Sequence, residues 1–235
     1  AVGSAPPPLR LMDPAADRGR SRMLVVHRID AEGIDLGALL ASLRATFGNE
    51  CLPINVPADN GRGVVDCFFQ PQGDSDLGPV APWHQKIIDQ VVEINESVMG
   101  HYLDDGESGL SGQELHDAFE QCLREGHLVP ICFVSARSGV GVKEFIHFAT
   151  KLLPNPKEGN PQPFEKGVGA NAQSILAIPD PSQHVIADVF KIVNDPFVGK
   201  LSVFRVYQGT VRKDTQLFVD DGKKPFKVGH LFRLK

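Results

Sequence analysis

The chain has 235 residues, which is enough for one large domain or two small ones. Its hydrophobic content of 42% and charged content of 23% are ordinary for a soluble globular protein. A formal net charge of −5 argues against a nucleic-acid-binding surface across the whole chain, but it allows a local basic patch. No apolar run approaches the length of a membrane span and no signal peptide is visible, so we expect a cytoplasmic protein with no membrane partner.

The cysteines argue against a metal centre and against a disulfide framework. No two of them have CxxC spacing, which disfavours a zinc site, so the sequence assigns no metal ligand. Each lies in an apolar run, which is typical of buried, reduced thiols in a cytosolic protein. The four are Cys51, Cys67, Cys122 and Cys132.

The first part of the chain alternates strand and helix patterns. The short apolar run Met23–Val26 is typical of a strand that is buried on both faces in a parallel sheet. A helical stripe of leucines follows Asp35 and ends at Gly48. Residues 51–56 and 63–69 then read as two strands around an Asp-Asn-Gly turn.

The alternation continues to residue 153. Apolar residues at helical spacing over 87–102 predict the longest helix of the chain. Ser111 and Glu114 form a capping-box pattern that begins another helix. Residues 129–134 predict a second buried strand, and 142–152 a last helix.

The pattern changes after residue 153. Residues 154–183 are rich in Pro, Gly, Asn and Gln and lack periodicity, which predicts an irregular linker between domains. Residues 184–235 then read only as strands, including a half-buried strand over 226–234. The predicted fold class is therefore α/β over 1–153, followed by an all-β domain.

The all-β part opens with a hairpin. The apolar runs 185–193 and 201–207 flank the loop 194–199, Asn-Asp-Pro-Phe-Val-Gly. Periodicity alone fits one hairpin of any β-barrel. The residues themselves, FKI, then DPFVGKL, then RVYQG, resemble the opening hairpin of the second domain of elongation factor G. This resemblance implies a translation-factor β-barrel, incomplete in this chain.

Two short segments each follow a predicted buried strand, where ligands of open α/β sheets bind. His27-Arg28-Ile29-Asp30 and the Ser135-Ala136 pair resemble the NKxD and SA motifs with which translational GTPases read guanine. The resemblance implies that Asp30 accepts hydrogen bonds from N1 and N2 of guanine, which adenine cannot offer. It implies that the stem of Arg28 lies along the base and that the backbone amide of Ala136, after Ser135, donates to O6.

Each segment also has a commoner interpretation. A lone Asp after a strand is usually a turn residue, and Ser-Ala before a Gly-rich turn usually begins a helix. The two segments in the family's order, with the barrel hairpin behind them, favour descent from a translational GTPase. His27 departs from the family, which has Asn there. Histidine cannot reproduce an amide's donor-plus-acceptor pair, which puts guanine binding in question.

The phosphate-binding motif G-x-x-x-x-G-K-[ST] does not occur in these residues, and Gly199-Lys200 lies in the hairpin rather than in a strand-to-helix turn. We therefore assign no catalytic residue and expect that this polypeptide alone does not hydrolyse GTP. The resemblance implies that a full-length parent binds GTP or GDP with Mg²⁺. We expect no nucleotide or metal to be held by these residues alone.

Residues 51–127 resemble the subdomain inserted in the GTPase domain of elongation factor G, which elongation factor Tu lacks. The chain, which does not begin with Met, therefore resembles an internal fragment of such a factor. The resemblance implies a monomeric, cytoplasmic GTPase that couples hydrolysis to translocation on the ribosome, contacting rRNA and ribosomal proteins. Alternatives are a ribosome-rescue or ribosome-protection factor, a non-enzymatic paralogue that has lost nucleotide binding and, more distantly, a metabolic nucleotide-binding enzyme.

Overall fold

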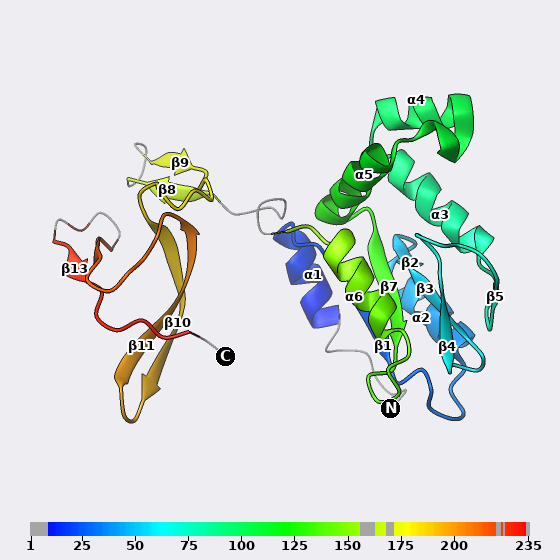
Figure 1. Ribbon diagram of the computed structural model, residues 1–235, viewed down its shortest axis with the longest axis horizontal. Coiled ribbons are helices and arrows are strands. Elements are labelled where there is room, and N and C mark those ends of the chain that lie inside the picture. Colours follow the sequence, from blue (N-terminus) through cyan, green and yellow to red (C-terminus); the bar gives the residue numbers. More distant parts are fainter. Residues whose placement is uncertain (1–8, 156–162, 168–171, 220–221, 223, 234–235) are drawn as a thin grey trace. The chain divides into compact units, whose positions relative to one another are not determined.

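The computed structural model describes residues 9–155, 163–167, 172–219, 222 and 224–233. The chain divides into two compact units, Ala1–Asn160 and Pro161–Lys235, drawn in Figure 1. The division falls inside the segment predicted to link two domains. No helix among the described residues is long and apolar enough to cross a membrane.

The first unit is built on a parallel sheet of three strands in the order β1-β7-β2. These strands are β1 (Leu24–His27), β7 (Val129–Val134) and β2 (Cys51–Pro53). The remaining strands of this unit form two antiparallel hairpins, β3 (Asn55–Ala58) with β4 (Gly63–Asp66) and β5 (Asp74–Ser75) with β6 (Gly78–Pro79). The helices are α1 (Leu9–Asp17), α2 (Leu36–Phe47), α3 (Ala81–Val92), α4 (Glu96–Asp105), η1 (Gly106–Gly109), α5 (Gly112–Glu125) and α6 (Val142–Lys151).

The central strand β7 is buried on both faces, as its continuous apolar sequence predicts. Alternate side chains enter two different cores, because successive residues of a strand point to opposite faces. Ile131 and Phe133 pack with residues of α1 and α2. Cys132 and Val134 pack with residues of α3, α5 and α6. Helices therefore cover both faces of this strand, an α/β arrangement (Figure 1).

The prediction that Met23–Val26 is buried on both faces is wrong. The strand forms one residue later, as Leu24–His27, and its residues alternate between half-buried and exposed. Val25 is 49% exposed. The physical reason is position, because β1 pairs on one side with β7 and is the edge of the three-stranded sheet.

The single long helix predicted over 87–102 is also wrong, because two helices occupy this stretch. Helix α3 ends at Val92, and Asn95 caps the start of α4 by accepting hydrogen bonds from the amides of Ser97 and Val98. Asn95 is extended, with φ of −140°, so its side chain replaces the continuing helical backbone as hydrogen-bond partner. The apolar spacing continues across the break because both helices pack against the same core.

Other local predictions are confirmed. Ser111 and Glu114 form a capping box at the start of α5, in which the pKa of Glu114 is lowered chiefly by the Ser111 hydroxyl. The Asp-Asn-Gly turn joins β3 to β4, and its three residues have φ of 54°, 58° and 75°. The run predicted as one strand, 51–56, is split between β2 and β3. The described cysteines are free and buried.

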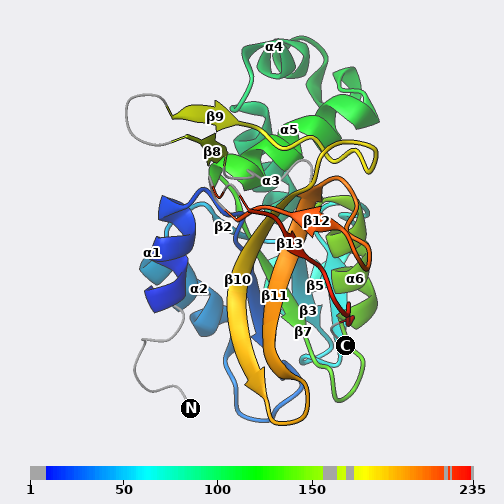
Figure 2. The ribbon, with the colours of Figure 1, turned by 90° about the vertical axis from the view of Figure 1, so that its left-hand side faces the viewer.

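The second unit consists of strands alone among its described residues. They are β8 (Phe164–Lys166), β9 (Gln173–Ile175), β10 (Ile186–Asp195), β11 (Gly199–Gln208), β12 (Gln216–Leu217) and β13 (Phe226–Lys227). The predicted hairpin is confirmed as the β10–β11 pair, the long twisted ribbon of Figure 2. Its turn is held by Asp195, which accepts from the amides of Phe197 and Val198, and these bonds lower the pKa of that carboxyl.

The described strands of this unit pair as three separate two-stranded sheets, and no pairing among them closes a barrel. Of the predicted strand 226–234, residues 226–233 are described, and among these only Phe226–Lys227 form a strand, while Phe232 is 64% exposed. The predicted linker is partly regular, because β8 and β9 lie within 154–183 and Phe164 packs on Tyr207 of β11 at 5.1 Å. Its residues 156–162 and 168–171 lie outside the described parts of the chain.

The core of the first unit offers a matched test of burial. Leu123 is 0% exposed and Leu103 is 74% exposed. Leu123→Ala should lower the free energy of unfolding by about 2–5 kcal/mol through lost burial and a residual cavity. Leu103→Ala should change it by less than about 0.5 kcal/mol. Urea unfolding followed by fluorescence of Trp83, the single tryptophan, reports this unit alone. Equal effects of the two substitutions would contradict the described core.

Candidate functional site

Parallel pairing of β1 with β7 brings the two predicted base-reading segments to one edge of the sheet. His27 lies opposite Val134, so the residues that follow each strand leave the sheet side by side. The amide of Ala136 donates a hydrogen bond to Nε2 of His27 at 3.3 Å. The expectation that these strands are neighbours is therefore confirmed, and residues more than a hundred positions apart in sequence come into contact.

The loop after β7 is tightly folded. Ser135 is fully buried, its amide donates to the carbonyl of Val140 at 2.8 Å, and its carbonyl accepts from Gly139 at 2.8 Å. Gly141 has φ of 71°, and a Cβ there would lie 2.3 Å from the carbonyl oxygen of Phe133. Only glycine fits both the left-handed backbone and this approach. The loop therefore presents exposed Ala136 beside exposed His27.

Asp30 lies in the same cluster. Hydrogen bonding from the Ser135 side chain, the largest cause, lowers the pKa of the Asp30 carboxyl, with smaller contributions from the Ser138 hydroxyl and the Arg137 charge. An ionised carboxylate only accepts hydrogen bonds, so Asp30 is suited to a ligand that offers N–H donors. Its half-buried side chain remains open to such a ligand.

Arg28 has a strained backbone. Its φ of 62° lies in the left-handed region, which a side chain other than that of Gly, Asn or Asp seldom adopts. The next residue, Ile29, is only 2% exposed, and its amide donates to the carbonyl of Val134 at 3.4 Å. The buried isoleucine fixes the bend, and the arginine side chain is exposed. Such strain is often maintained where a side chain must be presented to a ligand.

Two residues that sequence reasoning did not single out also reach these segments. Asn55 binds the backbone of β7 just before Ser135, and Gly61 packs against the backbone of Ile29. No sequence signal identifies the partner of either residue. The glycine of an Asp-Asn-Gly turn predicts the turn itself but not what lies against it.

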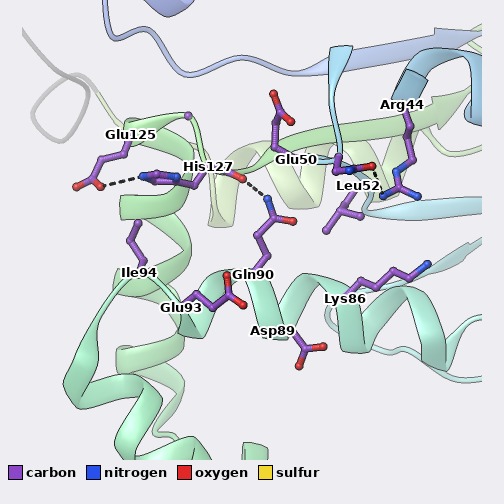
Figure 3. A pocket seen from close by; sticks show the side chains of 12 residues that line it. Arg44, Glu50, Leu52, Lys86, Asp89, Gln90, Glu93, Ile94, Glu125 and His127 are labelled. Atoms are coloured by element: carbon purple, nitrogen blue, oxygen red, sulfur yellow. Dashed lines mark hydrogen bonds and ion pairs between the residues drawn. The ribbon is translucent and has the colours of Figure 1, made fainter. Parts of the chain in front are cut away.

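A cavity of about 970 Å³ lies elsewhere in the first unit (Figure 3). It is lined by residues that precede β2 and β7, such as Glu50 and His127, and by Lys86 and Gln90 of α3. These positions mark the amino-terminal edge of the sheet, opposite the predicted site. A smaller cavity, about 500 Å³, lies directly beside Asp30. It is lined by Asp30 and the residues that follow it, and by the tip of the β3–β4 hairpin, but not by Ser135 or Ala136. We place the functional site at the Asp30 end of this cavity, because ligands of open α/β sheets bind at the carboxyl ends of the strands.

Comparison with known proteins supports the architecture. No family model matches the chain. The chain is similar to the crystal structure of a protein from Thermus thermophilus, with a TM-score of 0.64 and 27% sequence identity. The match covers 94% of this chain and 34% of the Thermus protein, so the chain spans about a third of that protein's length. The architecture thus recurs as part of a longer protein.

The contact between Ala136 and His27 predicts the tautomer of the imidazole. Because the amide donates, Nε2 must be unprotonated and the ring neutral, with its proton on Nδ1. Long-range ¹H–¹⁵N spectra at mildly alkaline pH should show an unprotonated Nε2, with His27→Asn used to assign the resonance. A protonated Nε2 at alkaline pH would contradict this geometry.

Proposed function

We propose that this chain is the guanine-reading part of a translational GTPase related to elongation factor G. The observation that carries the proposal is the convergence of Asp30, Ser135 and Ala136 at one edge of a parallel sheet, in the family's motif order. Either segment alone fits an ordinary turn. Their meeting across a sequence separation of 109 positions favours a shared ligand.

The chemistry follows from the groups at this edge. The Asp30 carboxylate accepts hydrogen bonds from N1–H and the 2-amino group of guanine, and the Ala136 amide donates to O6. Adenine presents no donor at N1 and an amino group at position 6, so both contacts reject it. The aliphatic stem of Arg28 lies along the face of the base.

The remaining assignments rest on the same proposal. The β10–β11 hairpin belongs to an incomplete translation-factor barrel, and residues 51–127 are the inserted subdomain. The parent acts in the cytoplasm as a monomer, binds GTP or GDP with Mg²⁺, and couples hydrolysis to translocation in contact with rRNA and ribosomal proteins. The phosphate-binding motif does not occur in this sequence, so this proposal assigns the phosphate and magnesium contacts to other parts of the parent.

One observation favours a second candidate, a non-enzymatic paralogue that keeps its binding surface and has lost nucleotide binding. The Ala136 amide donates a hydrogen bond to Nε2 of His27, whereas the first proposal requires the same amide to donate to O6 of guanine. The base can take this amide only when the imidazole moves away. Binding measurements with simple nucleotides separate the two candidates.

GMP titrated into the full 235-residue chain should perturb the amide resonances of Asp30 and Ala136, and AMP should not. The dissociation constant should be weak, on the order of 1 mM, because the phosphate contacts that supply most of the affinity are absent. Asp30→Ala should weaken GMP binding about tenfold or more through loss of charge-assisted hydrogen bonds. Asp30→Asn should instead favour XMP, whose 2-oxo group accepts from an amide.

The pH dependence of this binding has a defined sign. The folded-state pKa of Asp30 is depressed, so the carboxylate is fully available above its ordinary pKa and is lost only as the pH falls through the depressed value. GMP binding should therefore survive acidification further than an ordinary aspartate would allow. Equal binding of GMP and AMP by the wild type would overturn the guanine-reading proposal, and binding of neither nucleotide would favour the paralogue.

His27→Asn should strengthen GMP binding by about three- to tenfold, the net value of one hydrogen bond. The substitution removes the ring that accepts from Ala136 and restores an amide able both to donate and to accept. His27→Ala serves as the control, because it frees the Ala136 amide without adding an amide side chain, and it should give a smaller gain. Weaker binding by both variants would show that the imidazole itself contacts the base.

A further inference from the structure

The β3–β4 hairpin contacts the base-reading segment after β1 at one end, and at the other end it contacts β7 two residues before Ser135. Its base lies against β7 and its tip against the segment that follows β1. Neither contact involves the residues that the GTPase motifs identify. The hairpin belongs to the region that resembles an inserted subdomain, so its contacts connect that region to the base-reading edge.

At the end of the hairpin away from its turn, the side chain of Asn55 pairs with the backbone of β7, as a neighbouring strand would. Its Nδ2 donates to the carbonyl of Phe133 at 3.1 Å, and its Oδ1 accepts from the amide of Phe133 at 2.7 Å. Asn55 is 1% exposed, so no water competes for these bonds. A carboxamide paired in this way holds one residue of β7 in register, as a backbone ladder would. That residue lies two positions before Ser135 and three before the Ala136 amide.

At the tip of the hairpin, Gly61 lies against the backbone of Ile29. Its φ is 75°, and a Cβ there would lie 2.0 Å from the Ile29 carbonyl oxygen and 3.5 Å from the Asp30 amide nitrogen. The peptide bond that leads into Asp30 therefore rests on a surface that only glycine provides. The tip is itself fixed, because the carboxylate of Asp76 accepts from the amides of Asn60 and Gly61, each at 3.0 Å.

We propose that the β3–β4 hairpin sets the geometry of both base-reading segments, with Asn55 and Gly61 as positioning residues for the guanine contacts. This inference rests on the proposed function. Gly61 acts on Asp30, which reads N1 and the 2-amino group. Asn55 acts on the end of β7, which carries the donor to O6.

GMP and IMP distinguish the two effects, because IMP keeps O6 and N1–H but lacks the 2-amino group. Gly61→Ala should displace Asp30 and reduce the preference for GMP over IMP to near unity. Asn55→Ala should weaken binding of both nucleotides by about tenfold and leave their ratio unchanged. Loss of fold stability alone would not change the ratio in one variant and preserve it in the other.

Gly63→Ala is the matched control. It lies on the same hairpin, and its added Cβ would approach no atom closer than 3.3 Å, the carboxylate oxygen of Asp59. Affinity and nucleotide ratio should stay at wild-type values. If Gly61→Ala does not fold, Asp76→Ala loosens the tip without a clash and should reduce the GMP preference in part. A wild-type ratio of GMP to IMP affinity in Gly61→Ala or in Asp76→Ala would overturn the proposal. So would a ratio in Gly63→Ala that is altered as much as in Gly61→Ala.

The test separates this inference from the proposed function. If the wild type binds neither GMP nor IMP, the proposed function is wrong. The amide resonances of Asp30 and Ala136 then still test whether the hairpin positions these two residues. Gly61→Ala should then shift the Asp30 resonance and Asn55→Ala that of Ala136, and Gly63→Ala should shift neither. Unchanged resonances in the first two variants would refute the role of the hairpin.

Discussion

The parallel pairing of β1 with β7 is the constraint on which the site depends. With His27 opposite Val134, the segments after the two strands leave the sheet at the same edge. A register shift of one residue would turn every side chain of β1 to the other face and move Asp30 away from Ser135. Asp30 would then lose the hydrogen bond from the Ser135 hydroxyl that lowers the pKa of its carboxyl.

The pairing can hold this register because β7 is anchored on both sides. Its alternate residues enter two separate cores, and β2 and Asn55 occupy the edge opposite β1. A strand fixed on both faces and along both edges has little freedom to slide. The conformational strain of this arrangement lies in the segments after the strands. Arg28 adopts a left-handed backbone, and glycines such as Gly141 allow close approach of the chain.

Predictions from sequence were most accurate where the signal is local. Adjacent residues were enough to predict three features: the capping box of Ser111, the turn that includes Gly61 and the buried strand β7. They were least accurate where tertiary position overrides a pattern. The apolar stripe over 87–102 continues across a break that Asn95 makes, and the run at β1 looks fully buried although the strand lies at a sheet edge.

The sequence by itself determined the capping box of α5, the central strand β7, the β10–β11 hairpin and the residue types at two strand ends, because these depend on neighbours within a few positions. Only the tertiary structure decided that His27 accepts a hydrogen bond from the Ala136 amide, that the Ser135 hydroxyl lowers the pKa of Asp30, and that one hairpin contacts both Ile29 and Phe133. Asn55 and Phe133 are 78 positions apart, and Ala136 and His27 are 109 apart. No local pattern encodes such partners, because they are chosen by how the strands pair and which cores they share.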